Sequence, residues 1–117
     1  MKESILQNKS FSFAILVVNL YKHLKLDKRE FDLARQLLRA GTSIGANIEE
    51  ALGGQSRKDF AAKIAIAYKE ARETMYWLNL LKETNIISIK QYNEITPLLD
   101  EILRMLAKTQ MTLRKNK

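Results

Sequence analysis

The segment 31–52, with the sequence FDLARQLLRAGTSIGANIEEAL, decides the fold. At about 100° per residue, its apolar side chains and two glycines fall in one broad arc. The members of this arc are Phe31, Ala34, Leu37, Leu38, Gly41, Ile44, Gly45, Ile48 and Leu52. The segment therefore predicts an amphipathic helix that packs its apolar face into a core. Gly41 and Gly45 would let a neighbouring backbone come close.

Start and stop signals extend this helix and place one before it. Asp27 and Glu30 have the spacing of a capping box, which predicts that the helix begins there, and Gly53-Gly54 predicts its end near Leu52. An earlier helix is predicted from Ser10 or Ser12 to Leu26. Its apolar face would carry Phe13, Leu16, Val17, Leu20 and Leu24.

Two more helices are predicted towards the C-terminus. Ser56 resembles an N-cap for a helix that continues to about Thr84, and Ser88 with Gln91 forms a second capping-box match. Pro97 would either kink the last helix or start a new one with Thr96 as its cap. A kink is favoured because the apolar residues before and after the proline lie on one helical face. These residues are Tyr92, Ile95, Leu99, Ile102, Leu106 and Leu113.

The composition favours one all-helical domain. The 117 residues include only four glycines and one proline, which disfavours a turn-rich β fold. The connections are short, so successive helices should lie side by side and antiparallel. We therefore expect residues 1–117 to form a single domain, an all-α, antiparallel up-down four-helix bundle.

The residues that would support an enzyme or a cofactor site are missing from the sequence. There is no cysteine, and His23 is the only histidine, placed near Asp27 without a second ligand at metal spacing. Ser43 has no partner base for a hydrolase triad, and Gly53-Gly54 lacks the spacing of a phosphate-binding loop. We expect a protein that is not an enzyme and that needs no metal and no cofactor.

The apolar run 11–20 does not have the features of a targeting segment. It is too short to span a bilayer, and Lys22 and Lys25 follow it in place of a small-residue cleavage site. The expected location is the cytoplasm, and the absence of cysteine fits a reducing compartment.

The second and third helices each carry an outer face that does not look fully solvated. Ser43 and Asn47 are poor helix formers in mid-helix, and Trp77 shares its stripe with aliphatic side chains. The faces could be plain solvated stripes, with Trp77 along the bundle edge, or an interface with another copy. The interface interpretation is favoured for Ser43, Asn47, Glu50, Ile66, Glu70, Glu73, Trp77 and Leu81. Glu70 and Glu73 would pair with Arg35 or Arg39 of a neighbour.

The basic charge points to phosphate-bearing partners. The formal net charge is +7, and no acidic residue follows Glu101. Non-specific phosphate contacts are expected from Arg35, Arg39, Arg104, Lys108, Arg114 and Lys115. The cations at the C-terminal end could alternatively only solubilise the chain and complement the helix dipole.

Two stretches of the sequence carry a family resemblance. They are SIGANIEEALGGQSRKDF and KIAIAYKEARETMYWLNLL, and they resemble the four-helix-bundle proteins encoded in intervening sequences of 23S ribosomal RNA genes. That family includes the accessory variability determinant protein of diversity-generating retroelements. The positions that fit its pattern are Gln36, Arg39, Ala40, Ser43, Asn47, Ile48, Glu50, Ser56, Asp59, Phe60 and Glu73, with apolar matches at Ile86, Tyr92, Leu99 and Leu106.

The chain departs from the family pattern at three positions. Leu38 stands where a second arginine is usual, Gly45 where proline is frequent, and Ala51 where the motif ends in glycine. The resemblance implies a four-helix protomer of a ring-like homo-oligomer, a pentamer with a basic surface. Through the retroelement relatives it also implies nucleic acid and a reverse transcriptase as partners.

Two functions are consistent with these features. One is a basic, self-assembling protein that binds RNA or DNA phosphates non-specifically. The other is a structural adaptor that binds a protein partner such as a reverse transcriptase. Binding to a membrane surface has little support, because few aromatic side chains accompany the basic face.

Overall fold

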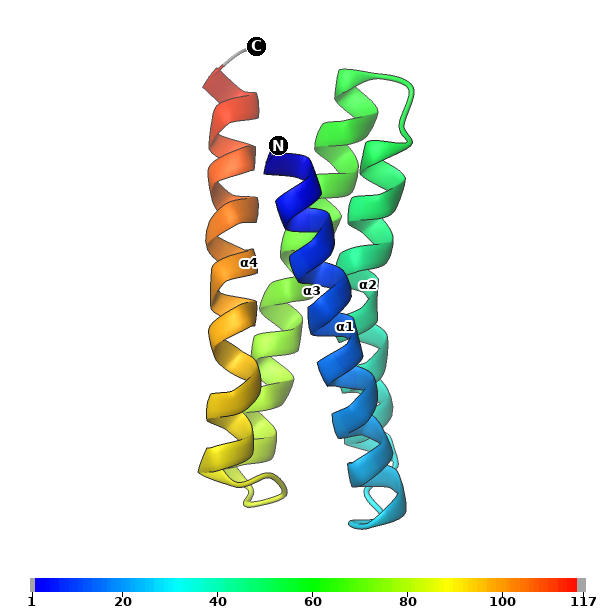
Figure 1. The fold of residues 1–117 in the computed structure, drawn as a ribbon, viewed down its shortest axis with the longest axis vertical. Helices are drawn as coiled ribbons and strands as arrows, with labels where there is room; N and C mark the ends of the chain where they lie inside the picture. Colours follow the sequence, from blue (N-terminus) through cyan, green and yellow to red (C-terminus); the bar gives the residue numbers. More distant parts are fainter. Residues whose placement is uncertain (1, 116–117) are drawn as a thin grey trace.

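The computed structural model describes residues 2–115, with side-chain surroundings for residues 5–115. It contains α1 (Lys2–Leu26), α2 (Asp32–Leu52), α3 (Arg57–Glu83) and α4 (Ile89–Lys115), and no strand occurs in this range. The molecule measures 47 × 21 × 21 Å, and Figure 1 shows successive helices running in opposite directions along its long axis. The predicted all-α fold with four helices is confirmed.

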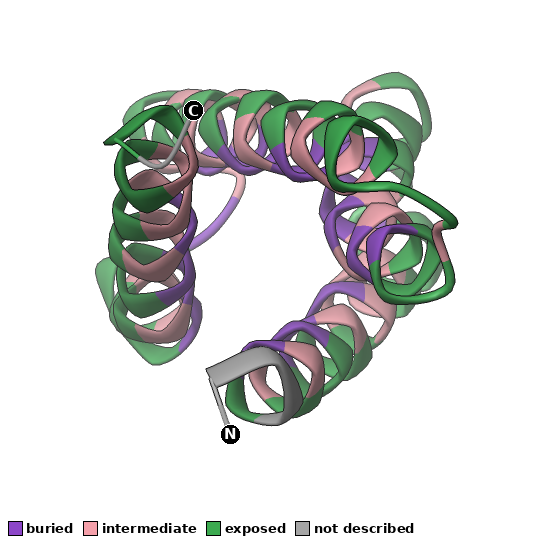
Figure 2. Ribbon diagram, turned by 90° about the horizontal axis from the view of Figure 1, so that it is seen from above, coloured by how far each residue is buried: buried purple, intermediate pink, exposed green. Residues whose placement is uncertain are grey.

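Each helix packs against two others. α1 and α3 both contact α2 and α4, so the four helices surround one core. Seen from above, buried positions line the inside and exposed positions the outside (Figure 2). The largest fully buried side chains are Phe13, Val17, Leu24, Leu37, Ile44, Ile48, Ile64, Leu78, Leu81, Leu99, Ile102 and Leu106. No helix within residues 2–115 combines the length and the hydropathy needed to cross a membrane.

α1 begins eight residues earlier than the first predicted start, because Ser10 is not a cap. Ser10 is buried, and its hydroxyl donates to the carbonyl of Gln7 at 3.0 Å inside the helix. The buried stripe extends upstream to Leu6 and continues through Phe13 and Val17 at helical spacing. Leu16, which was placed on the core face, is 37% exposed because the buried stripe of α1 is narrower than its apolar composition suggested.

α2 begins later than the capping-box spacing of Asp27 and Glu30 predicted. Arg29 has a φ of 53°, a left-handed conformation that interrupts helical geometry. Asp27 accepts from His23 instead, and Glu30 accepts from the backbone N–H of Leu33 at 3.1 Å. Phe31 precedes the helix and is 43% exposed, so its assignment to the core face is wrong.

The other helix boundaries agree with the sequence signals. Ser56 accepts from the backbone N–H of Asp59, and Ser88 and Gln91 exchange side-chain and backbone hydrogen bonds at 2.8 and 3.0 Å. α4 runs through Pro97 as one helix, and the Thr96 hydroxyl donates to the Tyr92 carbonyl. Thr96 therefore does not cap a separate helix.

Loss of the Ser56 cap gives a first testable change. Ser56→Ala leaves the Asp59 N–H without its side-chain partner and is expected to cost about 1 kcal/mol of unfolding free energy. Urea denaturation measures the change. Ser12→Ala, at an exposed position within α1, is the matched control and should stay within about 0.5 kcal/mol of the parent. Equal midpoints for both variants would contradict the capping role.

Candidate nucleic-acid interface and outer faces

The C-terminal half of α4 exposes most of the predicted phosphate-binding cations. Arg104, Lys108, Arg114 and Lys115 all lie on the solvent side. Arg104 pairs with Asp100 at 2.9 Å, but its side chain is 80% exposed, so this pair contributes little. Among the residues that the structure describes, Arg114 donates only to the Gln110 carbonyl, at 3.5 Å.

Two further cations lie at the same end of the bundle and were missed in the sequence. Ala61 of α3 lines a shallow pocket together with Gln110, Leu113 and Arg114 of α4. Arg57 precedes Ala61 by one turn on the same face, and Lys58 is exposed beside it. We call Arg57, Lys58, Lys108, Arg114 and Lys115 the basic end. The signal was present in the sequence as two cations that directly follow the Ser56 cap.

The two predicted cations of α2 are held by acids of the same chain. Arg35 pairs with Asp32 at 2.8 Å, one turn earlier. Arg39 pairs with Glu70 at 3.4 Å and also with Glu73. The expectation that Glu70 and Glu73 pair with arginines of a neighbouring copy is therefore wrong, since these pairs close the α2–α3 contact within the protomer. Arg39, held by two acids, is less available to phosphates than the basic end, whereas the exposed pair of Arg35 with Asp32 contributes little.

Trp77 belongs to the same polar network. Its indole N–H donates to Glu73 at 3.0 Å, and its ring packs edge-to-face against Tyr76 with centroids 5.1 Å apart. The ring is half-buried and packs against the core. Trp77 therefore lies along the edge of the bundle, whereas Tyr76 is 59% exposed.

The polar positions of α2 are mostly satisfied by local contacts. The Ser43 hydroxyl donates to the Arg39 carbonyl at 2.6 Å, and the Asn47 amide donates to the Ser43 carbonyl at 2.8 Å. Glu50 accepts from Lys63 at 2.8 Å, and this hydrogen bond together with the Glu50 charge raises the pKa of Lys63. All three side chains remain partly or fully exposed, so they still lie on an outer surface.

Two aliphatic residues of α3 that were predicted for the outer face differ in burial. Ile66 is 40% exposed, as an outer position should be. Leu81 is fully buried among core side chains, so its predicted place on the outer face is wrong. α3 packs against both α2 and α4, which widens its buried arc far enough to include Leu81.

The acidic and histidine side chains within the described range form no metal site. No group of three or more His, Cys, Asp or Glu side chains there is arranged to hold a metal ion. His23 lies 2.8 Å from Asp27, as its sequence position suggested.

Comparison with known proteins assigns the chain to a family. Residues 2–108 match the family described as 23S rRNA-intervening sequence protein. The chain belongs to this family. A solved structure of a protein with unknown function from the S23 ribosomal protein family of Bacteroides thetaiotaomicron VPI-5482 is 48% identical to this family member. The match has a TM-score of 0.92 and covers 95% of this chain and 99% of the other. No curated protein matches the chain.

Proposed function

We propose that this chain is a non-enzymatic protein that binds RNA or DNA phosphates without sequence specificity. The observation that carries the proposal is the basic end, where five exposed cations from α3 and α4 lie at one end of the bundle. Exposed lysine and arginine side chains attract the phosphate backbone over a range set by the salt concentration.

Sequence-independent binding fits the form of this surface. Its cations sit on flexible side chains at helix ends, a form suited to contacts with phosphates, which carry no sequence information. We do not assign a helix to a groove, because base reading needs side chains that reach base edges in a fixed register. A cytoplasmic location is part of the same proposal.

Equilibrium binding to unrelated oligonucleotides tests this function. Fluorescence anisotropy at low salt should give similar affinities for several RNA and DNA sequences of equal length. Absence of binding at low salt, or a strong preference for one sequence, would overturn the proposal.

We propose further that the up-down bundle is the protomer of a ring-like homo-oligomer. Phe11 and Ile15 of α1 are 69% and 49% exposed, and Ile66 and Tyr76 of α3 are also exposed. Apolar side chains of this size commonly mark contact surfaces. A closed ring would cover them in every copy, and the family resemblance favours a pentamer.

Substitution of Ile66 tests the assembly. Ile66→Glu adds a charge to the proposed interface and is expected to give protomers of 13.5 kDa in place of the oligomer. Size-exclusion chromatography with light scattering measures the mass. Ile89→Glu is the control, because Ile89 is 69% exposed and lies at the start of α4. An oligomer that persists in Ile66→Glu would remove this residue from the interface.

An adaptor that binds a protein, such as a reverse transcriptase, is the second candidate. The exposed rings of Phe11 and Tyr76 favour it, because aromatic side chains anchor many protein contacts. Binding of a protein partner through these rings would depend weakly on salt, whereas phosphate binding depends on it steeply.

A further inference from the structure

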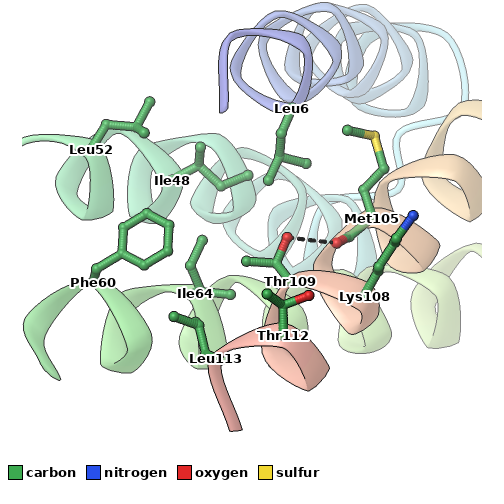
Figure 3. A pocket seen from close by; sticks show the side chains of 10 residues that line it. All are labelled: Leu6, Ile48, Leu52, Phe60, Ile64, Met105, Lys108, Thr109, Thr112 and Leu113. Carbon is green, nitrogen blue, oxygen red and sulfur yellow. Dashed lines mark hydrogen bonds between the residues drawn. The ribbon is translucent and has the colours of Figure 1, made fainter. Parts of the chain in front are cut away.

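An apolar pocket opens at the end of the bundle where α1 begins. It has a volume of about 290 Å³ and receives side chains from all four helices. Figure 3 shows Leu6 of α1 above it, the α2 and α3 side chains with Leu113 of α4 on one side, and the other α4 side chains opposite. The described residues that line it are Leu6, Ile48, Leu52, Phe60, Ile64, Met105, Lys108, Thr109, Thr112 and Leu113.

The lining suits a hydrocarbon chain. Seven of the ten side chains are apolar, and none is acidic. The Thr109 hydroxyl donates to the Met105 carbonyl at 2.9 Å, so this donor is already used. Water inside such a pocket would find few partners, and apolar cavities of ~150 Å³ stay dry and bind apolar molecules.

One cation lies at the rim. The stem of Lys108 lines the pocket, and its ammonium nitrogen lies at the edge of the group, beside Met105 (Figure 3). Lys108 is exposed and forms no ion pair with any acid within residues 5–115. An apolar interior with a single positive charge at its mouth is complementary to a chain that ends in one negative charge.

We propose that this pocket binds a fatty acid, with the hydrocarbon chain inside and the carboxylate beside Lys108. The interior supplies most of the affinity, because each buried methylene raises it about fourfold. The exposed pair with Lys108 contributes a smaller factor, about fivefold, and sets the orientation of the ligand. The site shares Lys108 with the basic end, but its apolar interior does not, since Leu6, Ile48 and Ile64 play no part in the basic end.

A chain-length series on the unaltered protein tests the proposal. After lipid extraction and refolding, isothermal titration calorimetry with butyrate, octanoate, decanoate and dodecanoate should show affinity rising about fourfold per methylene. The rise should level off once the pocket is full, at a stoichiometry of one per chain. No saturable binding of dodecanoate, or affinities that do not depend on chain length, would overturn the proposal.

Three variants locate the site. Leu113→Trp fills the pocket from α4 and keeps every cation of the basic end, and it should abolish dodecanoate binding. Lys108→Glu should weaken dodecanoate about fivefold or more and leave dodecanol unchanged, whereas Lys90→Glu, at the other end of α4, should change neither. Circular dichroism checks folding. Unchanged dodecanoate binding by folded Leu113→Trp overturns the proposal, and if that variant does not fold, the chain-length series decides.

Discussion

Replacing Gly41 with leucine is expected to destabilise the bundle by about 3 kcal/mol, which is a large part of the stability of a small domain. A Cβ atom at Gly41 would lie 2.7 and 2.8 Å from the two methyl carbons of Val17. Val17 is fully buried at the α1–α2 contact, so it has no free space into which to move. A leucine would add three more carbons to a position where the first already overlaps.

Gly45 provides a control in the same helix, because the expected change in stability there has the opposite sign. A Cβ there would meet the Ser10 carbonyl oxygen at 3.5 Å, which is an ordinary van der Waals contact. Gly45→Ala should therefore be neutral or stabilise α2 by up to about 1 kcal/mol, because alanine is the better helix former. Thermal and urea unfolding measure both changes. A Gly41→Leu variant as stable as the parent would show that α1 and α2 do not pack as closely as described.

Reversing three cations of the basic end is expected to lower RNA affinity about a hundredfold at low salt. Each exposed contact between a cation and a phosphate contributes about 1 kcal/mol, and the three contributions are roughly additive. The variant carries Lys108→Glu, Arg114→Glu and Lys115→Glu. All three side chains are exposed, so the fold should be retained. Fluorescence anisotropy with a labelled RNA gives the affinity.

A second triple variant has the same change in net charge. It shows whether RNA affinity depends on the position of the cations or on the net charge alone. Lys22→Glu, Lys28→Glu and Lys90→Glu alter exposed cations at the opposite end of the bundle (Figure 1). This variant should stay within about threefold of the parent, because the altered charges lie beyond the screening length of ~10 Å from the basic end. An equal loss of affinity in both triple variants would mean that net charge, and not the basic end, governs binding.

Local signals in the sequence predicted the helices and several of their ends. Ser56 with Asp59 and Ser88 with Gln91 act within four residues, so their spacing is sufficient to place α3 and α4. The pair Asp27 and Glu30 has the same spacing, but α2 does not begin where this pair predicts. The positive φ of Arg29 depends on how the chain turns from α1 to α2, and no local rule contains that information.

Burial at the margins of a helix face depends on the neighbouring helices. Leu81 lies at the edge of the apolar arc of α3, and contact with α4 as well as α2 brings it inside. The sequence predicts a cap at Ser10 because serine is common at helix starts, yet Ser10 is buried opposite Gly45 in mid-helix. The apolar arc of one helix does not tell how many neighbouring helices of the bundle pack against it.

The polar contacts of the outer faces were the hardest to predict. Arg39 lies 31 and 34 positions before Glu70 and Glu73, and only the packing of α2 against α3 brings them together. The basic end likewise joins residues from the start of α3 and the end of α4. Arg39 and Glu73, two positions that fit the family pattern, form an ion pair with each other in the structure.

The salt dependence of RNA and DNA binding tests the central claim most directly. If the basic end contacts phosphates, the logarithm of the duplex association constant should fall linearly with the logarithm of salt concentration, with a slope of about −4.5 for some five contacts. The triple variant of the basic end should reduce this slope by about 3. A slope near zero, or a slope unchanged by these substitutions, would contradict the claim that this 23S rRNA-intervening sequence protein binds nucleic acid through its basic end.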